Sequence, residues 1–444
     1  MLTLRHVERA STDDLMSLAS ERGSTPMQFG AVLMLEAGQS LDPGLVVAAI
    51  AHRAITVPRL RQRLVTVPWG CGRPVWADDG DFSVTSHFSV VPCPAPGGES
   101  AVLKVAAEML ATRLPRDRPL WTAKLLTDTG QGQAAMIIVF HHVLADGIGG
   151  LAILAGLVDG AAETPTSTFP MPMPSPQQLA IEATAGRIRS AQKLPEVLRR
   201  LHGAASQLRP VMGARPARCS LNQPTGARRR FTTVSVDLSH ILTAAHAHQA
   251  TVNDVVLSAI AAALHRLLAT RGELVEHFVI SVPFSARLHA SAGDLGNQSG
   301  VIPLRVTAVG DAVQRLESLA AATRAAKRTQ RGASTALLSP LFRLLAAAGL
   351  YRRFIDRQRL IHTFVTNLRG PQRRVSFLQC PITSIVPLTT ATGNVTVSFA
   401  VLSYAGSLTV TLVADPDTCP DLSELRDALA QELHLVTSGG PATR

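Results

Sequence analysis

The chain has 444 residues, of which 46% are hydrophobic and 17% charged, so it can bury a large core and is not disordered as a whole. This length favours two domains over one. The formal net charge is +11, almost all of it from arginine, which favours anionic partners such as phospholipid headgroups and other phosphate-bearing molecules. Nucleic acid ranks last because the basic residues are dispersed and only 4% of residues are aromatic. An arginine bias of a high-GC genome would give the same charge without any functional meaning.

No segment reads as a membrane span or an export signal. The longest apolar stretch, Ala134 to Val158, is interrupted by two histidines and Asp146, and the N-terminus lacks a basic region followed by an apolar one. The five cysteines are scattered without a CxxC pair, which argues against a disulfide framework and a zinc knuckle. We therefore expect a cytoplasmic protein with reduced thiols that touches membranes peripherally.

The first third of the chain alternates strand-like and helix-like stretches. The segments Phe29–Glu36 and Ala135–Phe140 are rich in Val, Ile, Leu and Met and predict strands, while Ser100–Leu114 has helical periodicity. A short buried helix is expected at Ile148–Leu157. These elements predict a mixed α/β lobe over residues 1–160.

A change of composition marks the end of this lobe. The stretch from Thr164 to Gln178 contains five prolines, which exclude a regular helix and indicate a linker. A basic helical stretch at Leu179–Leu208 and a glycine- and arginine-rich break at Pro216–Arg230 follow. We assign residues 161–220 to a proline-rich linker with a basic crossover helix.

The second lobe is expected over residues 221–444. Its strongest helix signal is Val252–Ala269, where apolar residues recur at helical spacing. The expected strands are Phe231–Leu238, Phe278–Val282, Gly300–Val306, His362–Thr366, Asn394–Leu402 and Gly406–Ala414, with a turn near Ala405 joining the last two. The sequence thus predicts two α/β lobes, and sites between lobes are common.

The sequence HHVLADG, from His141 to Gly147, carries the most specific chemistry. It follows the strand AAMIIVF, whose two-residue alternation places His141 and His142 on opposite faces. An imidazole can accept a proton from an alcohol near pH 7 and return it to a leaving group, as acyl transfer requires. Spacing alone does not choose between the two histidines. Asp146 could orient a ring or anchor the loop, and Gly147 would allow close backbone approach.

Two other interpretations of HHVLADG are weaker. A histidine pair at the end of a strand is usually packing or chance, but matching all four fixed positions of HHxxxDG by accident is roughly a one-in-a-thousand event. A metal site is disfavoured because the two histidines diverge and no third ligand lies at suitable spacing nearby. The full pattern therefore favours a catalytic centre.

Further motifs accompany HHVLADG in a fixed order. They are PRLRQRL at Pro58–Leu64, GRPVWADDGDF at Gly72–Phe82, RPLW at Arg118–Trp121, TVNDVVL at Thr251–Leu257, VPFSAR at Val282–Arg287, GNQSGVIPLRV at Gly296–Val306, TNLRGP at Thr366–Pro371 and SYAGSL at Ser403–Leu408. Over nearly its whole length the chain resembles the bacterial wax ester synthase/diacylglycerol acyltransferase family. That family belongs to the wider group of chloramphenicol acetyltransferase and the condensation domains of nonribosomal peptide synthesis.

The resemblance implies a fold, a reaction and a location. It implies two chloramphenicol-acetyltransferase-like lobes, each a mixed sheet flanked by helices, with the active-site tunnel between them. His142 would be the general base for transfer of a fatty acyl group from acyl-CoA to diacylglycerol or a long-chain alcohol. Asp146 would be structural, in a salt bridge to an arginine such as Arg287. Acyl-CoA would be a co-substrate, no metal or other cofactor would be needed, and an anionic membrane or lipid-droplet surface would be a partner.

The remaining candidate residues have alternative structural explanations. Asn253 and Asp254 could contact substrate or only cap a helix. Asn297 and Ser299 could donate hydrogen bonds to substrate or satisfy a loop, and Trp121 is expected in the core as structural support. The arginine clusters at 228–230, 324–331 and 352–359 are expected to be solvated faces, with CoA phosphate or membrane binding as the alternative.

Two departures from the family pattern bear on substrate preference. The chain has LPRD before RPLW where Pro-Leu-Asp is common, and MQFG at Met27–Gly30 replaces a form that contains histidine. Two other functions remain open. One is a condensation-type acyltransferase of specialised metabolism, and the other is a lipid-surface binding protein whose catalytic centre has decayed.

Overall fold

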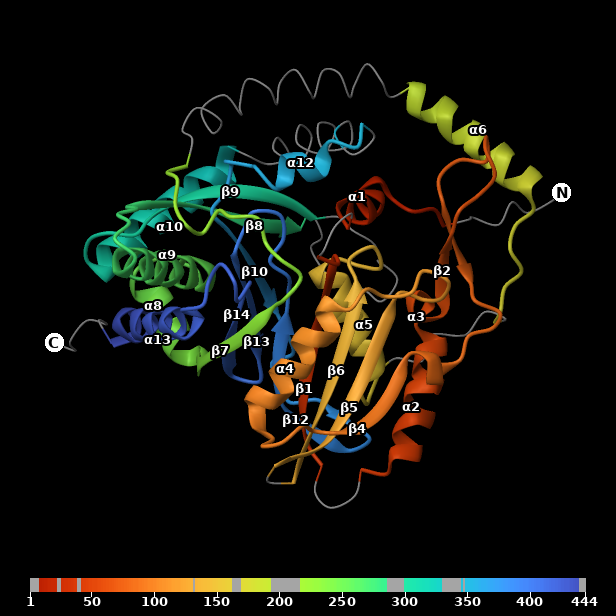
Figure 1. The fold of residues 1–444 in the computed structure, drawn as a ribbon, viewed down its shortest axis with the longest axis horizontal. Helices are drawn as coiled ribbons and strands as arrows, with labels where there is room; N and C mark the ends of the chain where they lie inside the picture. The colour runs from red at the N-terminus through yellow and green to blue at the C-terminus, as the bar shows by residue number, and fades with distance from the viewer. Residues whose placement is uncertain are drawn as a thin grey trace.

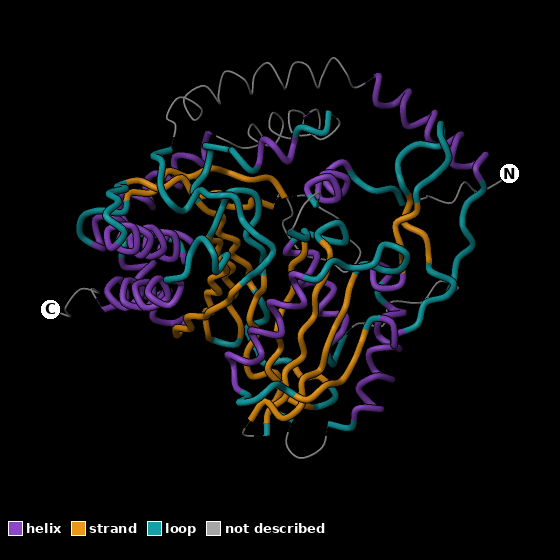
Figure 2. The backbone as a smooth tube through the Cα atoms, in the orientation of Figure 1, coloured by secondary structure: helices purple, strands orange, loops and turns teal. Residues whose placement is uncertain are grey.

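Two six-stranded sheets form the centre of the molecule, with helices packed against their faces (Figures 1 and 2). This computed structural model describes residues 8–21, 25–37, 41–130, 132–161, 169–192, 216–285, 299–329, 345 and 348–438. The two sheets meet where β12 (Cys380–Leu388) contacts β13 (Val397–Tyr404) and β14 (Ser407–Ala414). The expected arrangement of two mixed α/β lobes is confirmed.

The sheet of the first lobe has the order β11-β12-β1-β6-β5-β4. Its other strands are β1 (Gln28–Glu36), β4 (Phe88–Pro92), β5 (Trp121–Gly130), β6 (Gln133–His141) and β11 (Ser376–Phe377). The surrounding elements are α1 (Thr12–Ser20), α2 (Pro43–Thr56), α3 (Pro58–Arg61), η1 (Val84–Ser86), α4 (Gly98–Ala111) and α5 (Gly147–Leu157), with a small hairpin of β2 (Gln62–Val65) and β3 (Val75–Asp78).

The unbroken apolar run of β6 is explained by cover on both faces of the sheet. Ile138 and Phe140 pack in the core that includes residues of α2 and α5. Ile137 and Val139 pack in a second core, which includes residues of α4. A strand buried on both faces loses the alternation of apolar and polar residues that marks a half-exposed strand.

One segment crosses from the second half of the chain into the first sheet. β12 pairs antiparallel with β1, with Gly30 opposite Leu388, and β11 pairs with β12. Asp159, just after α5, holds this segment because its carboxylate accepts hydrogen bonds from the Ser376 hydroxyl and the Gln379 backbone amide. The division of the chain into residues 1–160 and 221–444 does not account for this exchange.

The sheet of the second lobe has the order β7-β14-β13-β10-β8-β9. Its other strands are β7 (Arg230–Asp237), β8 (His277–Ser285), β9 (Ser299–Thr307) and β10 (Thr363–Arg369). The helices are α8 (Leu238–Ala247), α9 (Val252–Thr270), α10 (Ala312–Thr329), α12 (Tyr351–Ile355) and α13 (Leu422–Ser438). All six strands expected for this lobe are present, with ends that differ by a few residues from the predicted ones.

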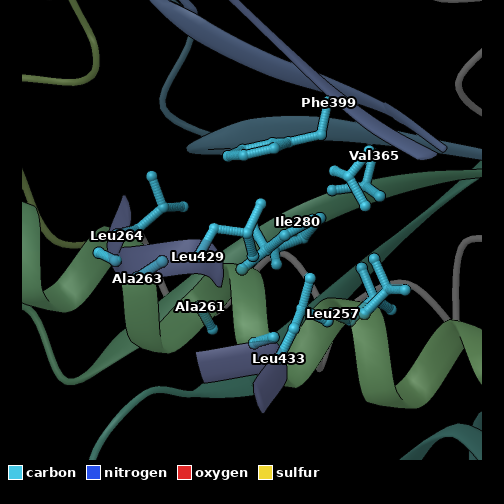
Figure 3. Packing of buried hydrophobic residues seen from close by; sticks show 14 of the residues in the cluster. Leu257, Ala261, Ala263, Leu264, Ile280, Val365, Phe399, Leu429 and Leu433 are labelled. Atoms are coloured by element: carbon cyan, nitrogen blue, oxygen red, sulfur yellow. The ribbon is translucent and has the colours of Figure 1, made fainter. Parts of the chain in front are cut away.

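Helix α9 is the centre of the second core. Leu257, Ala261 and Leu264 pack in one cluster with Ile280, Val365 and Phe399 of the sheet. Leu429 and Leu433 of α13 belong to the same cluster (Figure 3). α9 is also the one helix among the described residues whose length and composition would suffice to cross a membrane. Since 72% of its most apolar 18-residue stretch is buried inside the protein, its hydrophobicity is explained by this core.

The linker and crossover are only partly described. Residues 169–175 are irregular as predicted, but α6 (Pro176–Gln192) begins inside the predicted linker. Proline is tolerated in the first turn of a helix, where its missing N–H has no partner to lose. The other parts of the predicted linker and crossover helix, residues 162–168 and 193–215, lie outside the described residues.

Candidate active site

The HHVLADG sequence forms the end of β6, a tight turn and the start of α5. His141 is the last residue of β6 and lies opposite Gln28 of β1. The backbone N–H of Leu144 donates to the carbonyl of His141, and that of His142 donates to the carbonyl of Met27. Asp146 then begins α5 as its N-cap. The turn is therefore fixed by β1 on one side and by a capped helix on the other.

His141 has an enclosed environment. Its ring is buried, and Nδ1 accepts a hydrogen bond from the backbone N–H of Val143 at 2.9 Å. A nitrogen that accepts carries no proton, so the proton of the neutral ring is on Nε2. Nε2 lies 3.3 Å from Oε1 of Glu21, which is equally buried. Both ring nitrogens of His141 are thus directed at protein groups.

Glu21 follows α1 as its C-cap residue and joins three segments of the chain. Its carboxylate forms an ion pair with Arg116 as well as facing His141, and its backbone carbonyl accepts from the Arg113 guanidinium at 3.0 Å. Burial alone would raise the pKa of this carboxyl. His141 and Arg116 outweigh burial and lower the pKa from its ordinary 4.5 to about 2. Glu21 is therefore ionised at neutral pH.

His142 occupies the other side of the turn. Its ring is half-buried and packs against the ring of Phe29, with centroids 4.9 Å apart and planes inclined by 49°. Phe29 also contacts Phe140 and lies against Gly150 of α5, where an added Cβ would come within 2.5 Å of the ring. Gly150 therefore leaves the space that the Phe29 ring needs beside His142.

Asp146 and Gly147 build the start of α5. Oδ1 of Asp146 accepts from the backbone N–H of Gly149 at 2.9 Å, as an N-cap does. A Cβ at Gly147 would come within 3.0 Å of Leu368 in β10, so glycine lets α5 approach the second sheet closely. The salt bridge expected between Asp146 and Arg287 stays a prediction because Arg287 lies outside the described residues.

β10 connects two of the sequence motifs. The Asn367 side chain donates to Oδ1 of Asn253 at 3.3 Å, while the next residue, Leu368, packs on Gly147. Consecutive residues of a strand point to opposite faces. The HHVLADG turn and Asn253 therefore lie on opposite faces of the same strand.

The other predicted site residues are distributed over the second lobe and the core. Asp254 accepts from Thr251 in a capping box and from the Thr323 hydroxyl at 2.8 Å, which supports its alternative explanation as a cap. Ser299 opens β9, its side chain is not described, and Asn297 lies outside the described residues. Trp121 is buried and donates through Nε1 to the carbonyl of Leu60 at 2.7 Å, which matches a structural role.

Sequence reasoning did not find Glu21, and it assigned no site role to Arg116 or Phe29, which belong to the two motifs that depart from the family pattern. Those departures, LPRD and MQFG, both lie beside HHVLADG in space. Arg116 pairs with Glu21, and Phe29 packs on His142. Within the described part of the chain, no group of three or more His, Cys, Asp or Glu side chains could hold a metal ion. The site thus holds two histidines, with Glu21 and Arg116 on the side of His141 and the Phe29 ring packed on His142.

Comparisons with known proteins identify the family of the chain. The wax ester synthase/diacylglycerol acyltransferase catalytic domain matches residues 11–256, and the C-terminal domain of that family matches residues 295–437. A probable diacylglycerol O-acyltransferase of Mycobacterium tuberculosis, tgs1, is 29% identical over 426 residues, which cover 91% of each chain.

Solved structures share the fold over almost the whole chain. The wax ester synthase/diacylglycerol acyltransferase from Marinobacter aquaeolei VT8 has a TM-score of 0.71 at 22% identity, covering 98% of this chain and 99% of that one. The first condensation domain of the calcium-dependent antibiotic synthetase has a TM-score of 0.65 at 20% identity, covering 98% and 97%. The chain belongs to the wax ester synthase/diacylglycerol acyltransferase family.

Proposed function

We propose that this protein transfers a fatty acyl group from acyl-CoA to the hydroxyl of diacylglycerol, forming triacylglycerol, with His142 as general base. The observation that carries the proposal is the different environment of the two histidines in HHVLADG. Both ring nitrogens of His141 face protein groups, Val143 on one side and Glu21 on the other. His142 is half-buried at the turn between the first sheet and α5. His141 is only 1% exposed and His142 is more exposed, which supports His142 as the one of the two that meets a substrate.

The proposed reaction runs in a ternary complex of protein, acyl-CoA and acceptor. His142 removes the proton from the acceptor hydroxyl, and the oxygen attacks the thioester carbonyl to form a tetrahedral oxyanion. The C–S bond then breaks, and the same histidine returns the proton to the CoA thiolate. The products are the ester and free CoA, and the scheme uses acyl-CoA as co-substrate without a further cofactor or an acyl-enzyme.

The relatives support diacylglycerol as the acceptor. The chain covers 91% of a relative that is named as a diacylglycerol O-acyltransferase. A long-chain alcohol is the second acceptor we propose, since the family also includes wax ester synthases. The condensation-type alternative is weaker because the catalytic and C-terminal domain models of the wax ester synthase/diacylglycerol acyltransferase family both match this chain. The order of family motifs likewise disfavours a decayed site.

The test is to incubate the purified protein with a long-chain acyl-CoA and either diacylglycerol or a fatty alcohol. CoA release is measured above the background of the five free thiols of the protein, and the lipid product is identified by mass spectrometry. We expect His142→Gln to lower kcat by about 10²–10⁴-fold, the usual contribution of a general base. Without an acceptor, we expect no stoichiometric burst of CoA.

A matched control separates loss of the base from general damage. His52 is exposed on α2, and His52→Gln should leave turnover unchanged. Undiminished turnover of His142→Gln would overturn the assignment of the base. A folded wild-type protein that transfers acyl groups to neither acceptor would overturn the proposed activity.

We propose further that the protein works in the cytoplasm at an anionic membrane or lipid-droplet surface. Diacylglycerol dissolves in such surfaces and not in water, and the net charge of +11 favours anionic lipids. Sedimentation with anionic lipid vesicles tests this part of the proposal. The oligomeric state does not enter it.

A further inference from the structure

Trp69 is a fully exposed tryptophan, with 101% of its reference surface accessible. It lies at the tip of the hairpin formed by β2 and β3, in the sequence Val67-Pro68-Trp69-Gly70-Cys71. Tryptophan is usually largely buried, as Trp76 and Trp121 are here. A fully exposed indole gains free energy when it enters the boundary between water and lipid, where its ring prefers to lie.

The hairpin tip is held in place by α6. The guanidinium of Arg9 donates to the carbonyls of Cys71 and Leu179, which joins the tip to the first turn of the helix. Arg187 donates to the carbonyl of Gly70 at 3.2 Å and so holds the next residue after Trp69. A small buried core of Cys71, Val75 and Leu179 lies beneath these contacts. The hairpin tip that bears the exposed indole is therefore fixed to α6 by hydrogen bonds and a small core.

Helix α6 and the segment before it also expose aliphatic side chains to solvent. Ile181 and Ile188 are exposed, and because they are seven residues apart they lie on one stripe of α6. The opposite side of the helix is buried through Leu179 and Ala183. Met171 and Met173, in the segment that leads into α6, are exposed as well. Figure 1 shows α6 at the edge of the molecule, away from both sheets.

The charges around these side chains are mostly positive. The hairpin tip and α6 carry three exposed arginines, Arg73, Arg187 and Arg189, and one acidic residue, Glu182. The segment 169–175 carries no charge. Exposed aromatic and aliphatic residues flanked by arginine match the boundary of an anionic lipid layer, in which apolar side chains enter the acyl region and arginines meet phosphates.

We propose that Trp69, Met171, Met173, Ile181 and Ile188 form an interfacial surface that docks the protein onto an anionic lipid layer. The surface deepens the proposed function, because it would hold the enzyme where diacylglycerol is dissolved. The surface is inferred independently of the catalytic residues, from exposure and charge at the β2–β3 hairpin, segment 169–175 and α6.

Tryptophan fluorescence gives a direct test on the full-length protein. The chain has three tryptophans, and Trp69 is the exposed one while the other two are buried. Vesicles of equal parts phosphatidylcholine and phosphatidylglycerol should shift the emission to shorter wavelength as the indole leaves water. Trp69→Phe should abolish the shift and keep most of the binding. A shift that persists in Trp69→Phe would show that another tryptophan responds, and would overturn the proposal.

Vesicle sedimentation measures the affinity. Trp69→Ala, and separately the double variant Ile181→Ser with Ile188→Ser, should each weaken partition onto the mixed vesicles by about tenfold. Replacing Arg189 with glutamine should weaken binding to the anionic vesicles more than to pure phosphatidylcholine vesicles. Leu274 is 82% exposed in the loop between α9 and β8, so Leu274→Ser is the matched control and should bind like the wild type.

Two outcomes would reject the surface without touching the proposed activity. One is unchanged vesicle binding of Trp69→Ala and of the double isoleucine variant. The other is a wild-type protein that binds no vesicles yet acylates diacylglycerol dispersed in detergent. That result would indicate that the exposed side chains bind a protein partner. If acyl transfer itself is absent, the vesicle measurements still decide whether this surface binds lipid.

Discussion

The buried carboxylate of Glu21 offers a quantitative test of how the HHVLADG turn is held. Its pKa is lowered from 4.5 to about 2, and a displacement of one pH unit corresponds to about 1.4 kcal/mol. Glutamine has the shape of the protonated acid and lacks the charge. We therefore expect Glu21→Gln to reduce the free energy of unfolding by about 3 kcal/mol at pH 7.

The effect has a defined dependence on pH. Because the pKa of Glu21 is depressed in the folded protein, its stabilisation is present above about pH 4.5 and is lost as the pH falls toward 2. The difference between wild type and Glu21→Gln should therefore shrink to less than half at pH 3. Other titrating groups are common to both proteins and largely cancel in this comparison.

The measurement is urea unfolding followed by tryptophan emission. The buried Trp76 and Trp121 both lie in the first lobe, so their emission reports the lobe that contains Glu21. Glu108 is exposed on α4, and Glu108→Gln should stay within about 0.5 kcal/mol of the wild type. A loss below about 0.5 kcal/mol for Glu21→Gln, or a loss of equal size at pH 7 and pH 3, would refute the reasoning.

Three further predictions follow from single contacts. Gly150→Ala places a Cβ within 2.5 Å of the Phe29 ring, so the ring should shift and kcat for CoA release should fall about tenfold or more. Asp254→Ala removes a capping box and should lower the free energy of unfolding, measured in urea, by about 1–3 kcal/mol. The KM for acyl-CoA should stay unchanged. A raised KM at unchanged stability would instead indicate that Asp254 binds substrate. Asp159→Asn should lower stability by about 1 kcal/mol at pH 7. Burial raises the pKa of Asp159, but backbone amides and Arg53 lower it to about 2, so this loss should fade in urea titrations below about pH 4.

Local sequence signals predicted the strand, turn and helix around HHVLADG well. The apolar run before His141 is long enough for a buried strand, and Asp146 followed by glycines marks the start of a helix. The opposite directions of the two histidines followed from strand alternation. Cross-strand pairing with Gln28 then placed His141 on the side of Glu21, which spacing within the motif could not reveal.

Non-local features were out of reach of the sequence. β12 contains Pro381 and Pro387 and gives a weak strand signal, and its pairing with β1 joins residues more than 340 positions apart, such as Met34 and Ser384. Glu21 lies 120 positions before His141 and is one glutamate among many in the chain. A buried carboxylate is recognised by its neighbours in space, which a single sequence does not give.

The two departures from the family pattern looked independent in the sequence, but in the structure they form one support. The amide of Gln28 donates to the carbonyls of Leu110 and Thr112 and accepts from the N–H of Leu114, so MQFG holds the segment that leads to Arg116. Arg116 in turn pairs with Glu21 beside His141. Both therefore hold the HHVLADG turn from the side of His141. Among the departing residues, Phe29 packs on the His142 ring, so an effect of these departures on the choice of acceptor should be sought there.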